Sequence, residues 1–204
     1  MSEADDANYH AGMRALQDRF DTRRLADRLD ERLGRAEFTE QDKAFIESRP
    51  LFFLASADAQ GRRDCSHKGG APGFVRVVGP DELEFPSYDG NGQFRSLGNV
   101  LVNPSVGLLF IDFESPKRLR VNGRATLLDD PEALARHHGA LLVVRVRAGR
   151  IFPNCPRYIH RSAGAELSAD VPRPGHVPPA AAWKSMAIVA DVLPQPRQRD
   201  TPIR

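Results

Sequence analysis

The sequence has few cysteines, little excess charge and no long apolar segment. Its two cysteines, Cys65 and Cys155, are far apart and lack a metal-type spacing, so we expect reduced thiols in a cytoplasmic protein. No apolar run approaches the length of a membrane span, which predicts that the chain does not cross a bilayer. The acidic segment 1–6 lacks the basic and apolar parts of a signal peptide.

Several classes of function lack their sequence patterns. With 29 basic and 27 acidic residues, the net charge is +2, which argues against a nucleic-acid partner. No HExxH pattern and no Cys/His cluster is present, so no metal site is expected. A GxSxG elbow is also absent, which leaves hydrolase chemistry without support. The 204 residues, 41% of them hydrophobic and 27% charged, are typical of one soluble globular domain.

The order of patterns along the chain predicts a mainly β protein with flanking helices. Helical spacing covers residues 13–33, with a break near Asp21, and a second helix is expected from Thr39 to Ser48. Short strand patterns joined by turns follow, which favours an antiparallel barrel over a parallel α/β sheet. We therefore expect three parts: a helical extension over residues 1–38, a barrel over 39–163 and a Pro-rich tail over 164–204.

The most informative stretch is residues 86–99, which reads as a strand, a glycine-rich corner and a short helix. Arg95 and Ser96 fall in the first turn of that helix. Free backbone amides, the helix dipole and a guanidinium group would all attract the same anion. The stretch is neither a Walker loop nor a dinucleotide fingerprint, so by itself it only suggests a phosphate site.

Two further groups of polar residues are candidates for a ligand site. Strand alternation places Ser66 and Lys68 on one face of a strand and His67 on the other, and glycines follow that let a flat ligand approach the backbone. Taken alone, Lys68 is more typical of a solvated loop lysine beside turn glycines, since lysines are mostly exposed. Arg118 lies with other polar residues on one face of a later strand, which fits either a ligand wall or the wet side of a sheet.

Taken in order, these segments resemble the flavin-binding split-barrel family typified by pyridoxamine 5'-phosphate oxidase. The resemblance covers about residues 40–160 and is carried by segments 52–61, 65–74, 83–86, 90–91, 95–99, 103–113 and 118–125. It implies a six-stranded antiparallel Greek-key split barrel, a homodimer and two FMN sites at the interface between the subunits. It also implies a small-molecule substrate, with no nucleic acid and no membrane as partner.

The resemblance also implies roles for individual residues. Arg95 and Ser96 fall where the family holds the FMN phosphate. Many members have a lysine at the Ser96 position, so binding of the phosphate here is expected to be weaker or to be supplied by residues elsewhere. Arg118 falls where a polar residue reaches the flavin pyrimidine edge, and the segment 154–158 is expected to close the site from the partner subunit. The candidate cofactor-binding residues are Ser66, His67, Lys68, Gly69, Tyr88, Asn91, Arg95, Ser96, Asn99, Arg118, Asn154 and Arg157.

These expectations lead to an FMN-dependent oxidoreductase that transfers a hydride at flavin N5, with no catalytic side chain assigned. The alternative is a non-catalytic protein that binds or carries flavin, deazaflavin or haem. The chain ends differently from the family members that oxidise pyridoxine phosphate. It contains Trp183 but not the Arg-Leu-x-Pro segment of those members, which argues against vitamin B6 as the substrate.

Overall fold

The structure, a computed structural model, describes residues 8–88, 92–161, 179, 180 and 182–193. The chain divides into two compact units. One unit is Gly34–His176, and the other joins Met1–Leu33 to Val177–Arg204. The limits expected at residues 38 and 163 remain a prediction, and most of the expected Pro-rich tail lies outside the described residues.

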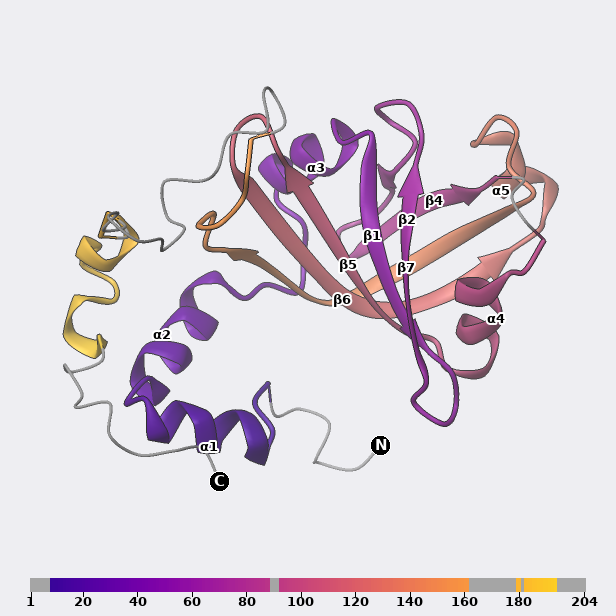
Figure 1. Cartoon of the computed structure of the whole chain (residues 1–204). Helices are drawn as coiled ribbons and strands as arrows, with labels where there is room; N and C mark the ends of the chain where they lie inside the picture. Colours follow the sequence, from indigo (N-terminus) through magenta and orange to yellow (C-terminus); the bar gives the residue numbers. More distant parts are fainter. Residues whose placement is uncertain (1–7, 89–91, 162–178, 181, 194–204) are drawn as a thin grey trace. The chain divides into compact units, whose positions relative to one another are not determined.

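The unit Gly34–His176 is built around one antiparallel sheet, shown in Figure 1 with its helices at the sheet margins. Its elements are α3 (Glu40–Glu47), β1 (Leu51–Ala57), β2 (Arg63–Gly69), β3 (Arg76–Val77), β4 (Glu82–Ser87), α4 (Arg95–Val102), β5 (Ser105–Asp112), β6 (Lys117–Leu128), α5 (Pro131–Ala135) and β7 (Leu142–Asn154). The predicted fold class, a mainly β antiparallel split barrel with flanking helices, is confirmed.

Two details of that prediction are wrong. The described residues form seven strands rather than six, in the order β2-β1-β5-β6-β7-β4-β3, and the terminal strands β2 and β3 do not pair to close the sheet. The strand β3 arises because the turn at residues 79–81 folds Arg76 and Val77 back against Glu84 and Leu83. The strand β7 runs without interruption from Leu142 to Asn154.

The core lies on one face of the sheet and is centred on phenylalanine rings. Phe52 of β1 is fully buried, and its ring centroid lies 4.9 Å from that of Phe85 and 5.1 Å from that of Phe110. Alternation along β1 buries Leu54 and Ser56 on the same face as Phe52. Each fully buried large apolar side chain stabilises the fold by roughly 1.5–3 kcal/mol. The register that keeps these side chains in the core also determines which side chains of the neighbouring strands point inward.

Helix α3 begins at the capping residue that the sequence predicted. The Thr39 hydroxyl accepts from the backbone N–H of Asp42, and the Asp42 carboxylate accepts from the backbone N–H of Thr39. Arg35 donates to the same carboxylate at 2.8 Å and also pairs through its backbone with Ile151 of β7. The chain before α3 is thereby tied to the sheet.

A backbone irregularity in the β6–β7 ladder requires a glycine. The pairing shifts between Asn122 and Gly123, so that β7 carries one extra residue at Gly149. A Cβ atom at Gly123 would lie 2.2 Å from the backbone oxygen of Arg147. Only a residue without a side chain fits this close approach.

The second unit contains the helices α1 (Ala11–Arg19) and α2 (Arg23–Leu33) and the 3-10 helices η2 (Ala182–Ser185) and η3 (Ala190–Val192). The predicted break is confirmed, since Asp21 adopts a left-handed φ of 52°. Leu25 packs with Val189 and Val192, and Arg28 forms an ion pair with Asp191. None of the helices in the described part of the chain is long and apolar enough to span a membrane.

We predict that Gly123→Ala destabilises the protein by roughly 1–3 kcal/mol, because the added methyl group overpacks the β6–β7 ladder. The matched control is Gly98→Ala in α4, where an added Cβ meets no atom within 4 Å. That change is expected to stabilise by about 0.5–1 kcal/mol, because alanine favours a helix over glycine. Urea unfolding measures both changes, and equal midpoints for the two variants would contradict this account.

Candidate functional site

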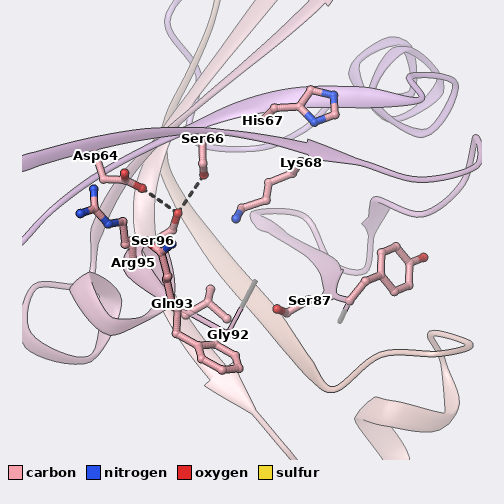
Figure 2. A pocket seen from close by; sticks show the side chains of 12 residues that line it. Asp64, Ser66, His67, Lys68, Ser87, Gly92, Gln93, Arg95 and Ser96 are labelled. Atoms are coloured by element: carbon pink, nitrogen blue, oxygen red, sulfur yellow. Dashed lines mark hydrogen bonds between the residues drawn. The ribbon is translucent and has the colours of Figure 1, made fainter. Parts of the chain in front are cut away.

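A cavity of about 410 Å³ lies where β2, the end of β4 and the start of α4 meet. Figure 2 shows the side chains around it, which are Asp64, Ser66, His67, Lys68, Ser87, Tyr88, Gly92, Gln93, Phe94, Arg95, Ser96 and Leu97. A second hollow of about 200 Å³ shares several of these residues and adds Gly69, Phe85 and Pro86. The larger cavity has the size of a small-molecule or cofactor site.

The register of β1 and β2 directs three polar side chains into the cavity. Lys68 lies opposite Phe52, Ser66 opposite Leu54, and Asp64 opposite Ser56. Directly opposed residues of antiparallel strands point to the same face, and the β1 partners face the core. The side chains of Asp64, Ser66 and Lys68 therefore share the inner side of β2 (Figure 2).

Helix α4 presents an uncapped N-terminus to the same cavity. Its N-cap residue Phe94 adopts a left-handed conformation, with φ 47° and ψ 30°, and provides no side-chain hydrogen bond to the first turn. Ser96, in that first turn, is buried, whereas Arg95 is exposed. Backbone amides without a capping side chain and a nearby guanidinium group favour an anionic ligand.

A chain of hydrogen bonds joins the helix to the strand. The Ser96 hydroxyl donates to Asp64 Oδ2 at 2.8 Å, and its oxygen lies 2.8 Å from the hydroxyl oxygen of Ser66. Because the single proton of Ser96 is given to Asp64, Ser66 must donate to Ser96 (Figure 2). Both hydroxyl protons therefore point toward the carboxylate of Asp64 along this series of hydrogen bonds.

Lys68 contributes a positive charge from inside this cavity. Burial lowers the pKa of its ammonium group from the ordinary value, while the negative charge of Asp64 acts in the opposite direction. Figure 2 shows the ammonium nitrogen pointing toward the space beside Ser96. The cavity thus combines one carboxylate with the cations of Lys68 and Arg95.

The structure brings six of the predicted site residues together in this cavity: Ser66, His67, Lys68, Tyr88, Arg95 and Ser96. The ring of His67 points to the opposite face of β2, edge-on to Phe53, so the predicted alternation is present. Gly69 borders the second hollow. Asn99 instead donates to Ser56 at 3.1 Å, and Asn91 lies outside the described residues.

Besides Asn99, three predicted residues do not line the cavity of their own chain. Arg118 and Asn154 lie opposite each other on β6 and β7, and Arg157 lies over the ring of Tyr158. The Nε atom of Arg118 and the Oδ1 atom of Asn154 are buried without a hydrogen-bond partner. They are polar atoms that remain available for an additional group.

Asp64 is the principal cavity residue that the sequence reasoning missed. It occupies position i−2 to Ser66 and i−4 to Lys68, so the period of two that joined those residues also includes it. Ser87, Gln93 and Phe94 were missed as well, since they lie beside the glycine-rich corner and no motif marks them. Within the described ranges, no three His, Cys, Asp or Glu side chains gather as metal ligands would.

A protein-family model described as Pyridoxamine 5'-phosphate oxidase matches residues 38–154, which is more than half of the chain. The match begins just before α3 and ends at the last residue of β7, so it includes the whole sheet and α4. Among curated proteins, none matches the chain.

Solved structures with a similar fold are also found. A putative pyridoxamine 5'-phosphate oxidase from Lactobacillus delbrueckii has 24% identity and a TM-score of 0.47, covering 58% of this chain and 95% of its own. An FMN-binding protein from Syntrophomonas wolfei has 10% identity and a TM-score of 0.43, covering 70% of this chain and 97% of its own. HutZ, the haem storage protein from Vibrio cholerae, has 19% identity and a TM-score of 0.41, covering 57% of this chain and 95% of its own. At these identities and scores, the matches carry no information on what this chain binds.

We predict that Lys68→Met raises the melting temperature of the ligand-free protein at pH 7. The folded-state pKa of Lys68 lies below its ordinary value of 10.5, so the unfolded chain binds the proton more tightly. The resulting penalty is fully present below the folded-state pKa and disappears as the pH rises toward the unfolded value. The gain from the substitution should therefore be smaller at pH 10 than at pH 7.

Scanning calorimetry at both pH values measures this difference. Lys43→Met on α3, which removes a lysine outside the cavity, is the control for the general effect of the substitution. A Lys68→Met variant that melts below the wild type at both pH values would show that the buried ammonium does not oppose folding.

Proposed function

Because the chain belongs to the pyridoxamine 5'-phosphate oxidase family, we propose that it is an FMN-dependent oxidoreductase acting on a small molecule. The observation that supports this most is the cavity in which Lys68, Arg95 and the uncapped start of α4 meet. A fold alone does not determine a reaction, so the proposal rests on this site.

The donors of the cavity suit an anionic cofactor end. Lys68 supplies an ammonium group, Arg95 a guanidinium group, and the first turn of α4 supplies backbone amides. The half-buried position of Lys68 strengthens its attraction for an anion, because water screens it less there. These residues would hold the side chain of the flavin and thereby orient its ring system.

A flavin supplies hydride transfer at N5 when it is bound, and the chain supplies position and charge. The exposed phenol of Tyr88, at the end of β4, offers an aromatic wall beside Ser87. No described residue of the cavity is assigned as a general acid or base.

We further propose that two chains pair through the outer face of the sheet. In an antiparallel sheet with one wet face, polar residues would alternate there. Here that face carries Phe53 opposite Leu109, with Phe152 farther along the same row. Apolar side chains on the face away from the core favour burial against a second copy of the chain.

Such pairing gives a role to the residues that lie outside their own cavity. Arg118 lies two residues before Arg120 on β6, and Arg120 pairs with Leu109 of the outer face. Residues two apart on a strand point to the same side, so Arg118 also points to the outer face. Asn154, opposite Arg118 on β7, lies on that face as well. In a dimer, the unpartnered polar atoms of Arg118 and Asn154 would be available to the cofactor site of the partner subunit.

The test is a spectrum of the freshly purified full chain, followed by addition of a reduced nicotinamide donor. We expect two visible flavin bands, their bleaching by the donor, and a mass by light scattering of twice the chain mass of 22.6 kDa. A Soret band would replace the flavin assignment with haem. A yellow protein that no donor reduces would be a carrier, and a flavin-loaded monomer would contradict the shared site.

We predict that Arg95→Ala weakens FMN binding by roughly 1.5–3 kcal/mol, the value of a charge-assisted hydrogen bond. Fluorescence titration of FMN into the wild type and the variant measures the change. Arg124→Ala on β6 removes an exposed arginine that is not part of the cavity and is the matched control. Unchanged FMN affinity in Arg95→Ala would rule out a phosphate site at the start of α4.

A further inference from the structure

The carboxylate of Asp64 is an unexpected group in a cavity that attracts anions. It lines the cavity together with Ser66 and Ser96, and it receives the hydroxyl proton of Ser96 at 2.8 Å. The proton of Ser66 in turn goes to Ser96. Neither hydroxyl can donate to a bound phosphate without giving up its place in this chain of hydrogen bonds.

Charge leads to the same conclusion. Asp64 carries one negative charge, which offsets one of the two positive charges that Lys68 and Arg95 bring to the cavity. The remaining attraction suits a group with one negative charge or none. A phosphomonoester carries nearly two negative charges at neutral pH, and its second charge would meet the field of the carboxylate.

The free lone pairs of Asp64 and Ser66 favour a different kind of ligand group. An ionised carboxylate accepts several hydrogen bonds, and Ser96 supplies one of them. The oxygen of Ser66, whose proton is directed to Ser96, can also accept. A hydroxyl group at this place could donate to these oxygens and accept from Lys68, whereas a fully ionised phosphate offers no donor.

We propose that Asp64 determines the cofactor specificity of the cavity, favouring a flavin side chain that ends in a hydroxyl over one that ends in a phosphomonoester. This role of Asp64 rests on the proposed function, because it concerns the same cavity. FMN remains a ligand, because Arg95 and the first turn of α4 attract its phosphate, but the carboxylate of Asp64 offsets most of the affinity that this attraction adds.

The experiment is a titration of the full-length protein with FMN, riboflavin and FAD, followed by flavin fluorescence, for the wild type and for Asp64→Asn. The wild type is expected to bind FMN and riboflavin with affinities within about tenfold of each other. Asp64→Asn removes the charge and keeps an oxygen that can accept from Ser96. It is expected to shift the ratio of the two affinities toward FMN by roughly tenfold, about 1.4 kcal/mol, because the carboxylate no longer repels the phosphate.

The matched control is Glu114→Gln, an exposed residue on the β5–β6 turn, which changes the net charge equally outside the cavity. It should leave the ratio of the two affinities unchanged. FAD, whose pyrophosphate carries two negative charges, is expected to bind no more tightly than riboflavin, and a clear preference for FAD over riboflavin would overturn the role of Asp64.

The outcomes distinguish this role of Asp64 from the proposed function. A wild-type preference for FMN above roughly 100-fold overturns the role of Asp64 while flavin binding stands, and it needs no variant. An unchanged ratio of FMN to riboflavin affinity in Asp64→Asn would likewise overturn the role of Asp64 while flavin binding stands. If the wild type binds none of the three flavins, the proposed function itself fails, and the specificity assigned to Asp64 fails with it.

Discussion

The hydrogen bonds between Ser96, Asp64 and Ser66 join the start of α4 to the edge strand β2, and the cavity depends on this junction. Each of the two bonds spans 2.8 Å. They hold a helix N-terminus beside a strand that lies about thirty residues earlier in the chain, because Ser66 and Ser96 are 30 positions apart. Without this connection, the positive end of the helix and the ammonium of Lys68 would not share one space.

On this face of the sheet, the β1–β2 register favours burial of apolar side chains but also buries polar side chains that suit a ligand. The strand β1 places Phe52 and Leu54 in the core, and its partner β2 places Lys68 and Ser66 directly opposite them. The inward direction that buries apolar groups on β1 thus partly buries a charge on β2. Burying that charge costs stability, and the cost is tolerated where it prepares an attraction for a ligand.

Much of this arrangement follows from local patterns in the sequence. Alternation predicted that Ser66 and Lys68 share one face of a strand, and the β1–β2 register confirms it. Thr39 signalled the start of α3 through its capping pattern. The glycine-rich corner before Arg95 indicated the short helix, because glycine turns and a change of hydrophobic period are local signals.

Other features depend on contacts between distant parts of the chain. The extent of β3 is one of them, since only Arg76 and Val77 pair with β4 across the turn. The hydrogen bond between Asp64 and Ser96 depends on α4 lying beside β2, whereas the sequence around Asp64 resembles surface charge on a polar strand. Likewise, Arg118 was expected beside the flavin but lies outside the cavity of its own chain, which no single-chain pattern reveals.

The central claim is that a flavin lies in this cavity with the end of its side chain at the start of α4. A crystal structure of the chain soaked with FMN tests it most directly. The account predicts that electron density for the side chain of the flavin ends between Lys68 and Ser96, with the partner subunit over the ring. Density for the flavin at another site, or side chains filling the cavity in the presence of saturating FMN, would contradict it.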